Sequence, residues 1–152
     1  MARKIVTWVV VADGTHARIY ANDGPRKGLR RALERDYEAG LPHYVRDILT
    51  DRRGSNAGGP GAGRHAMDAK TDPRRHVANG FARSIAAMLG EAAQERFFDR
   101  LILVAPPKAL GDLRAALPKP AGDRVTGTLD KDLVKHDEAS VARHLADSDL
   151  LL

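Results

Sequence analysis

The sequence predicts a single α/β domain, with a mixed sheet of about five strands and helices packed on it. The run 5–13 is apolar and rich in β-branched residues, which is typical of a strand buried on both faces of a covered sheet. Further along, short apolar segments alternate with segments of helical periodicity. The length of 152 residues suits one domain that buries its own core, and we place this domain at 1–147.

The first strand is expected to lead into an antiparallel hairpin. Residues 13–16, Asp-Gly-Thr-His, form a turn signal, and residues 17–20 resume as a strand. A second turn signal follows at 22–25, Asn-Asp-Gly-Pro. The segment 29–38 is ambiguous, because its apolar side chains recur at helical spacing although its flanks suit a third strand.

A long helix is expected from Pro73 to about Arg96, with Asp72 as the N-cap and the proline at the first helical position. A short helical turn is expected before it, at 43–49. One apolar stripe of the long helix should face the core, with basic residues on or near the other side. The stripe consists of Val77, Phe81, Ile85, Met88, Leu89 and Ala92.

The rest of the chain repeats a strand-to-helix pattern. A short strand is expected at 101–105, and the two prolines that follow it open a helix. Another strand is expected at 124–129, and Asp137 should cap a final helix. The acidic and apolar tail 148–152 is expected to fray.

Charge and composition narrow the classes of function that this chain can have. The formal net charge is +5, and residues 1–76 carry 15 Lys/Arg against 9 Asp/Glu, whereas residues 77–152 carry 10 against 11. This asymmetry predicts an anionic partner for the first half. The absence of cysteine excludes disulfides and cysteine nucleophiles and favours a reducing compartment. No stretch approaches the roughly 20 apolar residues of a membrane helix, so we expect a cytoplasmic protein with no membrane partner.

The segment 51–71 suits an anionic ligand best. Its glycines let backbone N–H groups approach a ligand, and its arginines can pair bidentately with phosphate. Because aromatic residues make up only 5% of the chain, contact with the nucleic-acid backbone is favoured over base readout. The alternative is an ordinary surface loop whose charges are solvated. The predicted phosphate-binding residues are Arg52, Arg53, Gly58, Gly59, Arg64 and His65, with Arg74 and Arg75 at the N-terminus of the long helix extending the patch.

Nucleotide-binding motifs are missing from this segment. After the glycines come Arg64 and His65, which supply neither the lysine nor the magnesium-binding hydroxyl of a P-loop. The dinucleotide fingerprint would follow a strand and open a helix, whereas a polar run surrounds these glycines. The histidines show no metal-site spacing, and His136 and His144 are expected near opposite ends of the last helical segment. We therefore expect no cofactor, no metal and no small-molecule substrate.

Two other functions remain open. Four carboxylates near strand ends could hold metal ions for a nuclease, although turns and solvated strand ends explain them more simply. A protein-interaction module is the second alternative, using the basic face of the long helix, the leucine tail or a homodimer formed through the sheet. The four carboxylates are Asp13, Asp99, Asp130 and Asp132.

Four segments taken together point to a known family. They are VVVADGTHARIY at 9–20, GRHAMDAKTDP at 63–73, FFDRLILVAPPKALGDLR at 97–114 and DKDL at 130–133. On these residues the chain resembles the bacterial host attachment proteins, which are similar to the middle domain of eukaryotic and archaeal class-I peptide-chain release factors. The resemblance spans nearly the whole chain and implies a release-factor-like fold in which 29–38 is a strand.

The resemblance also gives the glycine-rich segment a meaning. In release factors the corresponding loop carries Gly-Gly-Gln, whose glutamine helps water hydrolyse peptidyl-tRNA on the ribosome. Here Gly58 and Gly59 are followed by Pro60, and the one glutamine of the chain, Gln94, is near the far end of the long helix. The resemblance therefore implies a protein without release catalysis that binds the ribosome or RNA phosphates through this loop. A role in attachment to host cells would then be indirect.

Overall fold

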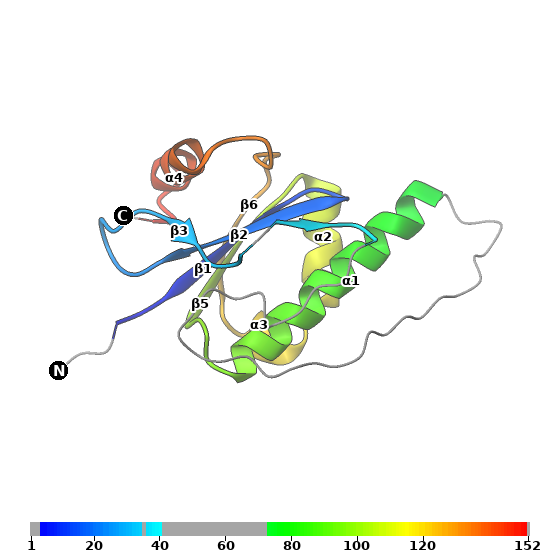
Figure 1. Ribbon diagram of the computed structural model, residues 1–152, viewed down its shortest axis with the longest axis horizontal. Helices are drawn as coiled ribbons and strands as arrows, with labels where there is room; N and C mark the ends of the chain where they lie inside the picture. Colours follow the sequence, from blue (N-terminus) through cyan, green and yellow to red (C-terminus); the bar gives the residue numbers. More distant parts are fainter. Residues whose placement is uncertain (1–3, 35, 41–72, 152) are drawn as a thin grey trace.

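A mixed sheet with helices on both faces organises the residues described by this computed structural model, which are 4–34, 36–40 and 73–151 (Figure 1). Its strands are β1 (Thr7–Ala12), β2 (His16–Asn22), β3 (Arg30–Arg31), β4 (Tyr37–Glu38), β5 (Arg100–Val104) and β6 (Val125–Leu129). The helices are α1 (Pro73–Gln94), α2 (Pro107–Ala116), α3 (Lys119–Gly122) and α4 (Glu138–Asp147). The predicted α/β class is confirmed, and two very short strands, β3 and β4, bring the sheet to six strands in the described part.

The sheet has the order β3-β2-β1-β5-β6, and β4 pairs with the other end of β2. β1 pairs antiparallel with β2, as the predicted hairpin requires, and parallel with β5, which pairs parallel with β6. Asp13 builds the hairpin turn, because its Oδ1 accepts hydrogen bonds from the amides of Thr15 and His16 at 2.8 and 2.7 Å. The carboxyl ends of the parallel strands β1, β5 and β6 lie on the same side of the sheet as this turn. This side is called the carboxyl edge below.

The segment 29–38 is extended, as the family resemblance implied, and not helical. β3 pairs with Tyr20 and Ala21, whereas β4 pairs with His16 and Ala17, so the segment follows β2 along its length in two short pieces. The helical spacing of its apolar residues misleads because Leu33 lies between the two strands and Tyr37 lies within β4. Both side chains are buried in the same core cluster, which they reach from different backbone positions.

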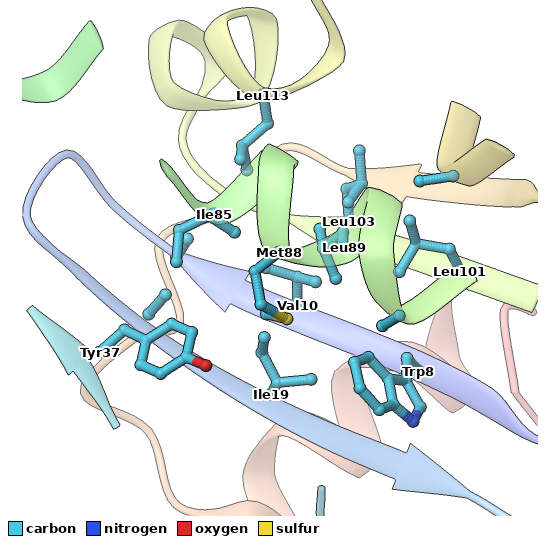
Figure 2. Packing of buried hydrophobic residues seen from close by; sticks show 14 of the residues in the cluster. Trp8, Val10, Ile19, Tyr37, Ile85, Met88, Leu89, Leu101, Leu103 and Leu113 are labelled. Atoms are coloured by element: carbon cyan, nitrogen blue, oxygen red, sulfur yellow. The ribbon is translucent and has the colours of Figure 1, made fainter. Parts of the chain in front are cut away.

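The core lies on both faces of the sheet. On one face, alternate strand side chains pack against α1, α2 and α3, and Figure 2 shows this cluster. Its labelled members are Trp8, Val10, Ile19, Tyr37, Ile85, Met88, Leu89, Leu101, Leu103 and Leu113. On the other face, Val9 and Val11 of β1 pack against α4 through Val141 and Leu145. This two-sided burial explains why β1 is buried at every position and apolar from Trp8 to Ala12.

The predicted apolar stripe of α1 is correct except at its first member. Buried positions on α1 begin at Phe81, whereas Val77 is 45% exposed. In Figure 1 the first turns of α1 project beyond the end of the sheet, so no strand covers them. The stripe was expected to be buried along the whole helix, but only the part that lies over the strands is.

Most local signals mark the correct boundaries. α1 begins at Pro73 as expected and ends at Gln94, and α2 begins at the second of its two prolines. Asp137 caps α4, because its side chain accepts a hydrogen bond from the amide of Ser140 at 2.8 Å. The one-turn helix α3 was not expected. The predicted turn at 43–49 and the predicted N-cap Asp72 lie outside the described residues.

The end of the chain contacts the core on the α4 side. Leu150 and Leu151 pack against the cluster that contains Val141 and Leu145. The amide of Leu150 also donates to the carbonyl of Leu145 at 2.9 Å. A Cβ on Gly127 of β6 would lie 2.5 Å from Leu150 Cδ2, so the absence of a side chain there makes room for this contact.

Two glycines of α1 should respond in opposite directions to alanine. A Cβ on Gly90 would lie 2.6 Å from Cγ of Pro118, a ring that cannot rotate away, whereas a Cβ on Gly80 meets open space. We expect Gly90→Ala to lower the free energy of unfolding by about 1–3 kcal/mol through overpacking. Gly80→Ala should raise it by about 0.5–1 kcal/mol, because alanine favours the helix. Urea denaturation at 25 °C measures both, and a stabilising Gly90→Ala would contradict the close approach.

Candidate nucleic-acid interface

The described residues contain only the helical part of the predicted phosphate-binding patch. Arg74 and Arg75 lie in the first turn of α1, Arg74 exposed and Arg75 partly buried. The other predicted positions fall outside the described residues. These are Arg52, Arg53, Gly58, Gly59, Arg64 and His65.

The first turn of α1 borders a hollow of about 560 Å³ at the carboxyl edge of the sheet. Three segments meet there: the β1–β2 turn, the start of α1 and the start of α2. The turn packs directly on the helix, since a Cβ on Gly14 would lie 3.4 Å from Cβ of Ala78. Apolar side chains form much of the lining, among them Val77, Ala78 and Ala109.

The starts of α1 and α2 give the hollow a positive character. Each helix has a proline at or next to its first position, where no backbone N–H is lost from the helix. Neither helix has an acidic residue in its first turn, so within the described residues no first-turn carboxylate opposes the positive end of either helix dipole. Arg74 and Lys108, which line the hollow, add exposed cationic side chains.

Arg75 is tied to α2 by a bidentate ion pair. Its Nη1 donates to Oδ2 of Asp112 at 2.9 Å, and its Nη2 donates to Oδ1 at 2.8 Å. The Asp112 side chain is 15% exposed and that of Arg75 is 36% exposed. The guanidinium fork expected to hold phosphate therefore holds a carboxylate in this structure. No local sequence signal indicates this pair, because the partner is 37 positions away.

The ion pair also changes the charge of the hollow. Asp112 is the one acidic side chain among its lining residues, and both carboxylate oxygens face Arg75. The negative charge is thereby compensated within the protein. Among the described lining residues, three cationic side chains, Arg74, Arg75 and Lys108, stand against this one carboxylate, so this part of the lining carries more positive than negative charge.

The four carboxylates of the nuclease hypothesis do not gather at one place. Asp13 forms the β1–β2 turn at the carboxyl edge. Asp99 lies at the opposite edge, where its Oδ2 accepts a hydrogen bond from the amide of Val6 at 2.9 Å. Asp130 and Asp132 are exposed after β6. Across 4–34, 36–40 and 73–151, no group of three or more His, Cys, Asp or Glu side chains could hold a metal ion.

Two histidines lie closer together than their spacing suggested. The rings of His136 and His144 meet edge to face, with centroids 5.4 Å apart. His136 precedes α4 and folds back along its first turn, where its Nδ1 lies 2.8 Å from Oγ of Ser140. Along the chain they lie near opposite ends of the last helical segment, as expected, since His136 comes just before α4 and His144 is in its last turn.

A second depression, of about 470 Å³, lies at the opposite edge of the sheet. Its charges balance, with Lys4 and Arg100 against Asp23 and Asp149. Arg30 donates to Asp23 at 2.7 Å, and this bond lowers the pKa of the Asp23 carboxyl, which remains ionised. The depression therefore has no positive excess that would select an anion.

The Arg75–Asp112 pair should stabilise the fold measurably. Because the geometry is bidentate and Asp112 is largely buried, we expect a double-mutant cycle with Arg75→Ala and Asp112→Ala to give a coupling energy of about 0.5–1 kcal/mol at low salt. The exposed pair Lys119–Asp123, with side chains 84% and 61% exposed, is the control and should couple less. Equal coupling in the two cycles would mean that the bidentate geometry adds nothing.

Comparisons with known proteins give the family of this chain. Among the described residues, no helix combines the length and apolarity needed to cross a membrane. Two similar solved structures are a crystal structure of an archaeal translation termination factor, with 11% identity and a TM-score of 0.47, and an archaeal protein, with 10% identity and a TM-score of 0.46. Each alignment covers 95% of this chain but only 39% and 38% of the other, so the chain spans about two fifths of their length. None of the curated proteins matches the chain.

The family assignment rests on a match along most of the sequence. A family model described as "Protein required for attachment to host cells" matches residues 8–145. The match extends from β1 to α4 and includes the hollow at the carboxyl edge. The chain therefore belongs to this host attachment family.

Proposed function

We propose that this protein binds phosphate groups of RNA, on the ribosome or free, through the basic segment 51–71 and the N-terminal turn of α1. The observation that carries the proposal is the positively charged hollow at the carboxyl edge, bordered by two helix starts. Segment 51–71 is joined to α1 through Asp72, and its last arginine, Arg64, precedes Arg74 by ten positions. The proposal uses the basic segment and the hollow together to bind one ligand.

The electrostatics of the hollow support an anionic ligand. A helix N-terminus favours a nearby anion by about 0.3–1 kcal/mol, and two helices begin here. Arg74 and Lys108 add long, flexible cationic side chains that can follow a phosphate backbone. The ion pair of Asp112 with Arg75 removes the repulsion that an isolated carboxylate would exert on phosphate.

The proposal assigns binding and no reaction. In this chain Pro60 follows Gly58 and Gly59. The glutamine that serves catalysis in release factors therefore has no counterpart at this position. Binding to RNA or the ribosome places the protein in the cytoplasm. The requirement for attachment to host cells would then be indirect, with RNA binding acting before the cell surface is involved.

Salt dependence tests the proposal directly. A fluorescein-labelled single-stranded RNA of about 12 nucleotides, and separately purified bacterial ribosomes, are titrated with the protein from about 50 to 500 mM salt. Contact with about four phosphates should give a slope of log affinity against log salt near −3. Arg52/Arg53/Arg64→Ala should reduce the magnitude of the slope by about 2, because three contacts are lost.

The matched control removes three cations elsewhere. Arg100/Lys119/Arg143→Ala takes the same charge from exposed positions on β5, α3 and α4, away from the hollow. The control variant should keep the slope of the unmodified protein. If both triple variants lose the same amount of this slope, the effect comes from net charge and not from the position of the arginines. Binding whose affinity does not change with salt would favour a protein-interaction module instead.

A further inference from the structure

The hollow at the carboxyl edge is larger and more apolar than phosphate binding requires. Phosphate is held by donors and charge, but this hollow of about 560 Å³ is lined largely by apolar side chains. Its volume lies within the range of sites that enclose a small organic group. Val77, which lines the hollow, is one of two large hydrophobic residues exposed in the described part of the chain.

Arg75 supplies a flat surface in this hollow. The guanidinium group is planar, and its two bonds to Asp112 fix the orientation of the plane at no cost when a ligand arrives. The side chain remains 36% exposed. Guanidinium planes stack on nucleobases, as aromatic side chains do, and among the described lining residues no side chain is aromatic.

The charges at the hollow match the groups that flank a base. A nucleotide in RNA has a flat base with stacking faces and polar edges, and its sugar is flanked by two phosphates. Here the apolar surface and Arg75 line the same hollow as two exposed cations, Arg74 on α1 and Lys108 on α2. Apolar surface and a fixed plane together with an excess of positive charge are complementary to such a nucleotide.

We propose that the hollow seats one unstacked nucleobase of bound RNA on Arg75 and the apolar lining, with the neighbouring phosphates on Arg74 and Lys108. The proposal rests on the RNA binding proposed above and specifies its ligand as single-stranded. A base in a duplex is stacked and paired, so it cannot enter the hollow. An acidic peptide with an apolar side chain is the competing occupant, and the test separates the two.

The test compares two ligands on the unmodified protein. One is a single-stranded RNA of about 12 nucleotides, and the other is an abasic ribose-phosphate oligomer of the same length and charge. Both should show the same salt slope, because their phosphates are the same. The RNA should bind about tenfold more tightly, which is the effect expected of one stacked base.

Two substitutions locate the effect in the hollow. Arg75→Lys keeps the charge but removes the plane, so it should weaken RNA binding about fivefold and leave the abasic oligomer unaffected. Val77→Ser alters an exposed position at little risk to folding and should weaken RNA binding two- to threefold, about what the loss of a small apolar contact gives. Arg83→Lys, at an exposed position of α1 that does not line the hollow, is the control and should change neither affinity.

The outcomes distinguish this inference from the proposed function. Equal, salt-dependent affinity for RNA and the abasic oligomer overturns the base seat and leaves phosphate binding intact. Failure of both oligomers to bind overturns the proposed function and the inference with it. Displacement of RNA by an acidic peptide carrying leucine, but not by the same peptide carrying serine, would assign the hollow to a protein partner and also overturn the base seat.

Discussion

The central position of β1 constrains every other element of the fold. It is paired with β2 on one side and β5 on the other, and all of its residues are buried. Trp8 and Val10 point toward α1, whereas Val9 and Val11 point toward α4, so both helical layers depend on one strand. A shift of one residue in its register would place each side chain against the wrong layer.

The same strand explains why two helix starts meet at one place. β2 takes the chain from the carboxyl edge to the opposite edge, and the segment 29–38, which pairs along β2, brings it back to the carboxyl edge at β4. Because β5 is parallel to β1, it starts at the opposite edge, and α1 makes the return to it. α2 then leaves from the carboxyl end of β5 to reach the parallel strand β6. Both helices must therefore begin at the carboxyl edge, and the hollow between them follows from the topology of the sheet.

Local signals in the sequence predicted most helix and turn boundaries, because the hydrogen bonds and backbone constraints behind these signals act within a few residues. Asp13 and Asp137 bond to amides two or three positions away, and Pro73 opens α1 where a proline is tolerated. The exposure of Val77 and the bond from Arg75 to Asp112 could not be predicted, since each depends on where α1 lies relative to distant segments. Helical spacing was also misleading over 29–38, where the apolar side chains are buried from an extended segment with two short strands.

The partner of Arg75 alters how binding energy is divided at the candidate site. From the sequence alone, Arg75 could be expected to pair with phosphate, but its guanidinium is held by a largely buried carboxylate, so its plane is fixed and its charge is balanced by that of Asp112. In the proposed function, the phosphate contacts then fall to Arg74, Lys108 and the segment 51–71, which would position a nucleic-acid backbone without reading its sequence. Under the same proposal, discrimination between single-stranded and paired RNA would come from the apolar part of the hollow, because only an unstacked base could reach it.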